Sequence, residues 1–375
     1  MTAELTVGTR FGGSEPAHLW APRLNRHTFW CGQSGSGKTY ALGVLLEQVL
    51  LHTRLPLVIL DPNGDFVRLP EIREDAPADL AAELAARDIR VCGAGPDATD
   101  PLHIRYLNMQ LTSRAALLQV DPVEDPDDFN ALLRIDAKIR DAMDVIGLAA
   151  GERQSLGLRD SLVQWLRAQP DPEFSRLAIR LENLGVADWT LWAWGDRGAV
   201  DVIDARPDAT VVDLSGFDTG VEPRAAALAI LDHLWAHRHE RIGRLIVIDE
   251  AHNLCPPNPV TPIQKLLTER IVQIAAEGRK YGLWLLMSTQ RPSKVHPNAL
   301  SQCDNLGLMR MSSPRDLAEL GSVFGYAPDE LREQATGFGQ GQVLFAGGFA
   351  AEPMLVQMGP RLTREGGADV PVELR

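Results

Sequence analysis

Cysteine is scarce in this chain of 375 residues, and its four copies lie far apart, at Cys31, Cys92, Cys255 and Cys303. No C-x-x-C pair occurs, so the sequence encodes neither a disulfide framework nor a zinc ribbon. Long apolar runs are also lacking, because the best one, 41–51, is interrupted by Glu47 and is too short to span a bilayer. The first thirty residues show no basic start followed by an apolar stretch. We therefore expect a soluble protein of a reducing cytoplasm, without a membrane partner.

Basic residues are fewer than acidic ones, with 37 Lys and Arg against 50 Asp and Glu and a formal charge of −13. Binding to nucleic acid phosphates depends on Lys and Arg, so this balance excludes a surface that coats nucleic acid generally. A local exception lies at 261–294, where six basic residues accompany two acidic ones. Acidic residues concentrate elsewhere, notably at 121–128. Any DNA contact is therefore expected to be local. The alternative is that the basic segment 261–294 and the acidic segment 121–128 are both ordinary solvated surface.

Short apolar runs rich in β-branched residues alternate with helical patterns. The runs indicate buried parallel strands at 29–31, 57–60, 210–214, 245–248, 283–288, 306–309 and 343–346. Helical patterns between them cover 39–52, 222–239 and 262–277. Alternation of this kind predicts an α/β fold with a largely parallel, doubly wound sheet flanked by helices.

The strand signal disappears between about 110 and 200. Asp128 can cap a helix that runs to about 148, and a second helix is expected over 152–168. We interpret 111–199 as a helical insertion in a core made of 1–110 and 200–359. The segment 360–375 is expected to be a C-terminal tail, either flexible or an arm over a neighbour's nucleotide. Near the end of the insertion, packing or a subunit contact is a better interpretation than base stacking for Trp189, Trp192 and Trp194.

A glycine-rich motif, G-x-x-x-x-G-K-[ST], follows the first buried strand and precedes a helical pattern. It consists of Gly32, Gln33, Ser34, Gly35, Ser36, Gly37, Lys38 and Thr39, and Tyr40 continues the predicted nucleotide-binding segment. The glycines allow backbone N–H groups to surround an anion, and the helix N-terminus adds partial positive charge. We expect Lys38 to neutralise the β- and γ-phosphates and Thr39 to offer its hydroxyl to Mg²⁺. The alternative, a chance glycine-rich turn, does not explain the strand–loop–helix context.

Two carboxylates follow the strand at 245–248, where the sheet's C-terminal edge meets the ligand in such folds. We expect Asp249 to hold the Mg²⁺ shell and Glu250 to orient or deprotonate the attacking water. Gln290 follows the next strand and is a candidate sensor of the γ-phosphate, although a strand-terminal turn residue is the alternative. No N-K-x-D guanine signature is present. These residues predict ATP hydrolysis by a RecA-like P-loop NTPase of the glutamate-using (ASCE) type.

Together these residues resemble the FtsK/HerA group of hexameric DNA-pumping ATPases, and HerA-like proteins in particular. The likeness rests on Leu24-Asn25-Arg26-His27, Leu60-Asp61-Pro62-Asn63-Gly64-Asp65-Phe66, Asp249-Glu250-Ala251-His252, and Glu277-Gly278-Arg279-Lys280-Tyr281-Gly282 leading into Ser288-Thr289-Gln290-Arg291-Pro292. The third of these also spells the DEAH box of two-lobed helicases. A second RecA-like domain would not fit in the residues after Gln290.

The resemblance implies roles for three further residues. Asp61 would lie near the nucleotide, Arg26 near its phosphates, and Arg279 would enter the neighbouring subunit's site as an arginine finger. A planar fork of N–H donors suits the charge that spreads over transferring phosphoryl oxygens. The alternative for Arg279 is a helix C-terminal residue that balances the dipole, since Lys280 could serve equally.

The resemblance further implies a hexameric ring that uses ATP and Mg²⁺ to translocate or unwind double-stranded DNA. A nuclease or other effector would be its partner, and antiphage defence is a plausible setting. Longer HerA proteins begin with a small β-barrel domain, and we expect a compact form without it, since about 25 residues precede the P-loop strand. The alternative function is an ATP-gated oligomeric scaffold that regulates an effector enzyme, with hydrolysis as a timer. The acidic surface suits that alternative.

Overall fold

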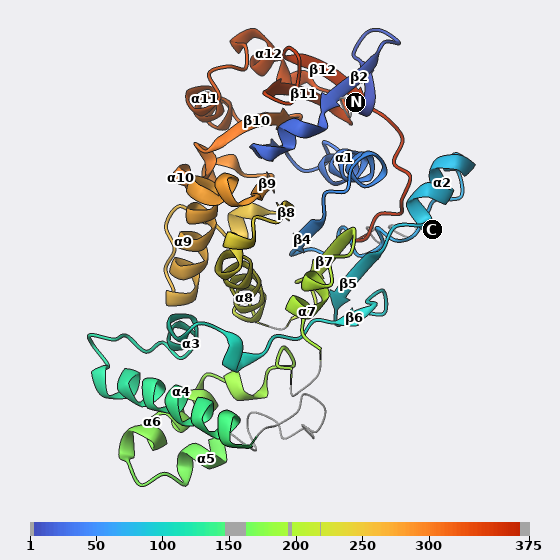
Figure 1. Cartoon of the computed structure of the whole chain (residues 1–375). Helices are drawn as coiled ribbons and strands as arrows, with labels where there is room; N and C mark the ends of the chain where they lie inside the picture. The colour runs from blue at the N-terminus through green and yellow to red at the C-terminus, as the bar shows by residue number, and fades with distance from the viewer. Residues whose placement is uncertain (1–3, 147–162, 194–196, 218, 368–375) are drawn as a thin grey trace, which may run out of the picture.

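The computed structural model describes residues 4–146, 163–193, 197–217 and 219–367. In this part of the chain, helices cover both faces of one 12-stranded sheet, and a cluster of helices extends from one end of the molecule (Figure 1). The strands are β1 Glu4–Arg10, β2 Pro16–Trp20, β3 His27–Cys31, β4 Leu57–Asp61, β5 Ile89–Gly93, β6 Asp100–Pro101, β7 Ala209–Asp213, β8 Arg244–Ile248, β9 Leu283–Thr289, β10 Cys303–Leu308, β11 Gln342–Gly347 and β12 Met354–Met358. The α-helices are α1 Lys38–His52, α2 Ala78–Ala85, α3 Leu111–Leu117, α4 Pro126–Ile146, α5 Gln164–Arg167, α6 Pro172–Asn183, α7 Ala199–Asp204, α8 Glu222–Ala236, α9 Pro262–Glu277, α10 Pro297–Leu300, α11 Pro314–Val323 and α12 Asp329–Glu333. None of the helices in the described ranges is long and apolar enough to cross a membrane.

The sheet has a parallel and an antiparallel part, in the order β2-β1-β12-β11-β10-β3-β9-β8-β4-β7-β5-β6. Every pair from β10 to β6 is parallel, which confirms the predicted α/β fold with a largely parallel sheet. The prediction of a parallel strand at 343–346 is wrong, because β11 pairs antiparallel with both β10 and β12. An apolar run buried on both faces has the same pattern in either direction, so the sequence could not reveal this.

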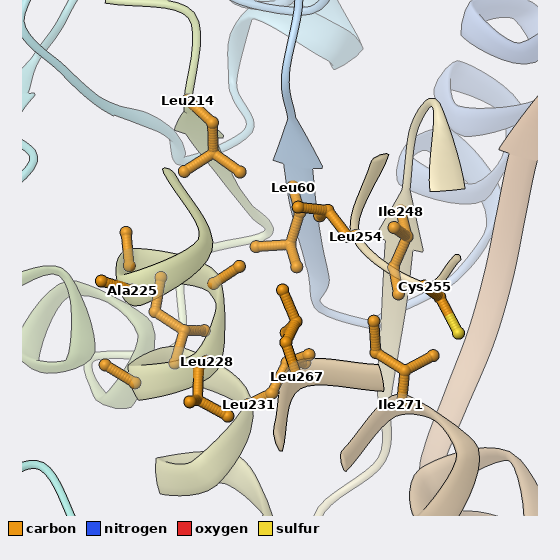
Figure 2. Packing of buried hydrophobic residues seen from close by; sticks show 14 of the residues in the cluster. Leu60, Leu214, Ala225, Leu228, Leu231, Ile248, Leu254, Cys255, Leu267 and Ile271 are labelled. Atoms are coloured by element: carbon orange, nitrogen blue, oxygen red, sulfur yellow. The ribbon is translucent and has the colours of Figure 1, made fainter. Parts of the chain in front are cut away.

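Each central strand sends alternate side chains to opposite faces of the sheet. In β4, Leu60 belongs to the hydrophobic cluster shared with α8 and α9, and Ile59 belongs to the cluster shared with α1. Figure 2 shows Leu60 and Ile248 directed toward Leu267 and Ile271 of α9. Burying each such side chain contributes about 1.5–3 kcal/mol. The strands are therefore held from both sides, and so are the strand ends that carry the polar residues described below.

The boundaries of α9 follow from its flanking residues, and the predicted range 262–277 is confirmed. Thr261 Oγ1 accepts the N–H of Gln264 at 3.4 Å, and Gln264 Oε1 accepts the N–H of Thr261 at 3.3 Å. This reciprocal capping box is followed by Pro262, whose fixed φ suits the first helical position. The helix ends before Gly278, where a Cβ would lie 2.6 Å from the carbonyl oxygen of Leu283. Only glycine allows that close return of the chain into β9.

The segment predicted as a helical insertion contributes α3 to α6 and the start of α7 to the described residues. The prediction that Asp128 caps its long helix is wrong, because α4 already begins at Pro126. The buried carboxylate of Asp128 instead lies 2.8 Å from Arg176 Nε and 3.1 Å from Arg180 Nε on α6. Charged donors are stronger partners for a buried carboxylate than the backbone N–H groups of a helix end. Most of the second predicted helix lies outside the described residues.

The tryptophans near the end of this segment pack within the chain. Trp192 is buried and donates its Nε1–H to the carbonyl of Val186 at 2.6 Å. Trp189 stacks on it with ring centroids 5.5 Å apart. Packing, the interpretation preferred from the sequence, is therefore confirmed for these two residues, whereas Trp194 lies outside the described residues.

The chain after β12 returns to α1 and is pinned there by a buried carboxylate. Glu47, in the middle of α1, accepts the N–H groups of Leu362 and Thr363, each at 2.8 Å. The Arg361 side chain is fully buried, and its Nε lies 3.7 Å from Glu47 Oε1. The first residues of the expected C-terminal tail are thus part of the core, and 368–375 lie outside the described residues.

Replacing Arg361 with alanine should lower the free energy of unfolding by about 3 kcal/mol, because Glu47 would keep its burial and lose its cation. Burial raises the pKa of Glu47, and the Thr363 hydroxyl, two backbone N–H groups and Arg361 oppose that rise. Urea denaturation with linear extrapolation measures the change. The control is Arg364→Ala, at a half-exposed arginine nearby, which should change stability by less than about 0.5 kcal/mol. A loss below about 1 kcal/mol in Arg361→Ala would contradict the assigned role of the pair.

Candidate nucleotide-binding site

The glycine-rich loop joins the C-terminal end of β3 to the first turn of α1, as predicted. Gly35 and Gly37 have φ values of 72° and 84°, in the left-handed region that glycine enters without strain. Gly32 is closely packed, since a Cβ there would lie 2.7 Å from the Cβ of Met309. Ser34 is exposed. A loop folded this tightly at a helix N-terminus has the backbone shape that surrounds a phosphate.

Two segments outside the motif hold this loop in place. The N–H of Gln33 donates to the carbonyl of Arg310 at 2.9 Å, and the N–H of Gly341 donates to the carbonyl of Ser36 at 2.9 Å. The Arg310 side chain returns to the loop and donates through Nη2 to the carbonyl of Gly35 at 2.9 Å. The protein's own hydrogen bonds thus hold the loop in this shape, and Arg310 adds a cation beside it.

Lys38 is buried at the carboxyl ends of β8 and β9. Its Nζ lies 2.8 Å from Asp249 Oδ1, 3.1 Å from Glu250 Oε1 and 3.0 Å from Ser288 Oγ. Burial alone would lower the pKa of Lys38, but the two carboxylates outweigh it and the net pKa is raised. The ammonium is therefore charged at neutral pH and lies where phosphate oxygens can compete with carboxylates for its protons.

Glu250 is held in one orientation by its neighbours. Its Oε1 accepts the side-chain N–H of Gln290 at 2.9 Å, and its Oε2 lies 3.1 Å from His252 Nδ1. Burial raises the pKa of Glu250, but His252, Lys38 and Gln290 outweigh it and bring the pKa to about 2. Its backbone φ of 42° is unusual for a non-glycine residue, and such strain clusters at functional sites. The carboxylate is thus ionised at neutral pH and fixed in direction, as a base that orients water requires.

His252 connects this carboxylate to the end of β9. Its Nδ1 lies 3.0 Å from Thr289 Oγ1 as well as near Glu250. The Thr289 hydroxyl oxygen also accepts the N–H of Arg291 at 3.0 Å. Three contacts in series, from Arg291 to Thr289, from Thr289 to His252 and from His252 to Glu250, thus link the backbone after β9 to the Glu250 carboxylate.

The residues expected to hold Mg²⁺ fit that ion. Thr39 Oγ1 faces carboxylate oxygen, donating to Asp65 Oδ2 at 3.3 Å. Asp249 Oδ2 and Ser36 Oγ are buried, and neither has a hydrogen-bond partner among the described residues. No three His, Cys, Asp or Glu side chains among the described residues form a metal cage by themselves. Mg²⁺ usually binds to one or two protein oxygens together with substrate phosphates and water, which is the donor set offered here.

Asp61 lies at the end of β4 beside this cluster, but its carboxylate is directed into its own loop. It accepts the N–H groups of Asn63, Asp65 and Phe66 at 3.3, 3.0 and 2.7 Å. Burial raises the pKa of Asp61 to about 7 against the effect of these donors. Asp61 therefore shapes the loop that carries Asp65 toward Thr39. The nearer carboxylate, Asp65, was not singled out from the sequence although it lies four residues along the same motif.

Arg26 and Arg279 lie at the N-terminal ends of the parallel strands, whereas the P-loop of the same chain lies at the C-terminal ends. Arg26 directly precedes β3, whose other end leads into Gly32, and a five-residue strand spans about 16 Å. Arg279 lies in the 3-10 turn Gly278–Tyr281 before β9. Arg26 is therefore separated from the P-loop of its own subunit by the length of β3, and its expected place near phosphates stays a prediction for a neighbouring subunit's site.

The hydroxyl oxygen of Tyr40, which directly follows the P-loop motif, accepts the N–H of Arg361 at 2.7 Å. Four residues that line the site were not predicted as site residues: Asp65, His252, Ser288 and Arg310. The first three belong to motifs that sequence analysis had identified. Arg310 follows the predicted strand at 306–309, and its position after a buried strand was the available signal.

A P-loop after one buried strand, an Asp-Glu pair two strands away and a polar strand end between them define a RecA-like P-loop NTPase of the glutamate-using type. The family model for the central domain of helicase HerA matches residues 5–154. The DNA double-strand break repair helicase HerA of Pyrococcus furiosus is 22% identical over 379 residues, which cover 89% of this chain and 65% of that protein. A probable helicase of Methanocaldococcus jannaschii is 28% identical over 362 residues, covering 89% and 66%. The chain thus spans just under two thirds of the length of these relatives.

Solved structures share the fold. VirB4 of Thermoanaerobacter pseudethanolicus aligns with a TM-score of 0.63 at 15% identity, covering 95% of this chain and 96% of that one. The bacterial conjugative coupling protein TrwB aligns with a TM-score of 0.57 at 13% identity, covering 95% and 88%. The match to the HerA central-domain model and the similarity to HerA relatives support a HerA-like ATPase of the FtsK/HerA superfamily.

Proposed function

We propose that this protein hydrolyses ATP with Mg²⁺ and, as a homohexameric ring, uses hydrolysis to move double-stranded DNA in concert with a nuclease or other effector. The observation that carries hydrolysis is the Glu250 carboxylate, which is ionised, oriented by Gln290 and His252, and adjacent to Lys38. A site that only binds nucleotide needs no such base. The named relatives, a DNA repair helicase and a probable helicase, support DNA as the substrate.

In the proposed reaction, the phosphate groups of ATP enter the glycine-rich loop and Lys38 transfers its hydrogen bonds from carboxylates to phosphate oxygens. Mg²⁺, held by Thr39 and Asp249, would neutralise charge on the phosphate oxygens. Glu250 orients a water molecule whose oxygen bonds to the γ-phosphorus while the bond to the β–γ bridging oxygen breaks. The products are ADP and inorganic phosphate, and the water proton passes to Glu250 or to the phosphate.

We assign Arg279 to the site of the neighbouring subunit. It lies at the edge opposite to its own P-loop, and its side chain is about one third exposed. In a head-to-tail ring, that edge faces the nucleotide of the next subunit. A guanidinium supplied in this way makes hydrolysis depend on assembly.

The candidate DNA surface comprises the loops at 253–262 and 291–302. The N–H of His296 donates to the carbonyl of Cys255 at 2.8 Å, so the two loops lie side by side. Lys265, Arg291 and Lys294 are exposed on or beside them. This local basic group, on a chain of strongly negative net charge, is what supports contact with DNA phosphates.

The triple variant Lys265→Ala, Arg291→Ala and Lys294→Ala should bind duplex DNA more weakly and lose the stimulation of hydrolysis by DNA. If each residue contacts one phosphate, the slope of log affinity against log salt should fall by about 3. Fluorescence anisotropy with labelled duplex at several salt concentrations measures this slope, and ATPase assays measure stimulation.

The matched control removes three exposed arginines elsewhere, Arg54, Arg90 and Arg197. It changes net charge equally and should leave both readouts unaltered. Equal losses in the two variants would show a general charge effect instead of a DNA surface. A wild-type rate that ignores duplex DNA would favour the scaffold alternative, in which the ring regulates an effector.

A further inference from the structure

Three charged side chains meet at the sheet edge that faces away from the P-loop. Asp304 Oδ2 lies 2.5 Å from Arg279 Nη1 and 3.6 Å from Arg26 Nη1. Arg26 precedes β3, Arg279 precedes β9, and Asp304 is the second residue of β10. These strands are adjacent in the order β10-β3-β9, so all three side chains lie at the same end of neighbouring strands.

A single carboxylate oxygen therefore binds two guanidinium groups. The guanidinium groups of Arg26 and Arg279 would repel each other, and the Asp304 carboxylate between them reduces that repulsion. In the described part of the chain, neither arginine has another acidic partner within ion-pair distance. Burial and the charge of Arg279 lower the pKa of the adjoining His27 to about 4, so no third cation joins the cluster at neutral pH.

The cluster remains open to solvent on its outer side. The exposed fractions of the side chains are 42% for Arg26, 31% for Arg279 and 48% for Asp304. Each guanidinium has five N–H donors, and Asp304 is the only described side chain to which Arg279 donates. Most donors thus stay available to a ligand that approaches from outside the subunit.

We propose that Asp304 is a positioning residue, which holds Arg26 and Arg279 as a pair aimed at the nucleotide of the neighbouring subunit. This inference rests on the trans role assigned above to Arg279. Free arginine side chains sample many rotamers, and fixing two of them before the phosphate arrives removes that ordering from the reaction step. Without Asp304 the arginines would still be present but would spread apart.

The test is steady-state ATP hydrolysis by the assembled ring of full-length protein. Asp304→Ala should lower kcat about tenfold, with KM for ATP and the mass of the ring unchanged. Asp304→Asn keeps an oxygen acceptor without the charge and should fall between wild type and Asp304→Ala. The matched control is Asp79→Ala, which removes one exposed carboxylate from α2 and should have no effect.

The decisive variant adds Asp304→Ala to Arg26→Ala with Arg279→Ala. If Asp304 acts through the arginines, it has no further effect on kcat in that background. A tenfold loss in both backgrounds, unchanged kcat in Asp304→Ala, or a rise in kcat would overturn the inference. If Asp304→Ala fails to assemble, the same comparison with Asp304→Asn decides it. If Arg279→Ala alone leaves kcat unchanged, the proposed trans role of Arg279 is wrong, and so is the role of Asp304 that depends on it.

Discussion

Glu250→Gln should hydrolyse ATP about 10² to 10⁴ times more slowly than wild type while still binding nucleotide. Glutamine has the shape of glutamate and can keep the contact with Gln290, but it cannot accept a proton and does not carry the charge that pairs with Lys38. Rapid-quench measurement of kcat, together with binding of a fluorescent ATP analogue, separates the two effects. The ATP-bound ring should accumulate.

The control for this variant is Glu83→Gln, the same change at an exposed position on α2. It should retain the wild-type rate. If Glu250→Gln hydrolyses ATP within a factor of about two of wild type, another group must orient the water, and the proposed mechanism is wrong.

Arg279→Ala should lower kcat by about 10³ or more, because the charge on the transferring phosphoryl group would lose its guanidinium. The loss should be repaired by mixing with Lys38→Ala, which has an inactive P-loop and an intact Arg279. In mixed head-to-tail rings, about a quarter of the sites would combine a working P-loop with a working arginine. ATPase activity measured across mixing ratios, after subunit exchange, tests this expectation.

The result that contradicts a trans arginine is a mixture no more active than the sum of its parts while mass measurement shows mixed rings. A cis role would be inconsistent with the placement of Arg279 at the opposite edge from its own P-loop. Lys280→Ala is the neighbouring control, since Lys280 is exposed and could have served as the helix-end cation. It should retain most of the wild-type rate.

The core of the fold could be predicted because its central strands are apolar on both faces and end in polar motifs. All seven predicted strands are present. The strands β1, β2, β5, β6 and β12 were not predicted. β1 and β12 alternate exposed or half-exposed with buried residues, and β6 has only two residues. Short, half-buried strands acquire their identity from the neighbour they pair with, which a local pattern does not contain.

The site shows the same division between local and long-range information. Lys38, Asp249, Glu250 and Gln290 follow from motifs attached to strand ends, and the structure brings them together. Only five residues of sequence separate Arg26 from Gly32, but they form the whole of β3, so the two residues lie at opposite ends of that strand. The partnership of Asp304 with the two arginines joins segments far apart in the chain, so no local pattern could reveal it.

The segment after β12 gives the nucleotide site an unusual mechanical connection. Arg361 Nη1 donates to the carbonyl of Thr39 at 3.4 Å, and the N–H of Gly366 donates to the carbonyl of Asp65 at 3.1 Å. The same short stretch thus ties together the two chain segments that carry Thr39 and Asp65. These two hydrogen bonds fix the distance between the start of α1 and the loop after β4. A reaction step that changes the distance between Thr39 and Asp65 would strain these hydrogen bonds. The segment 361–366 would therefore respond to changes at the phosphates without contacting them.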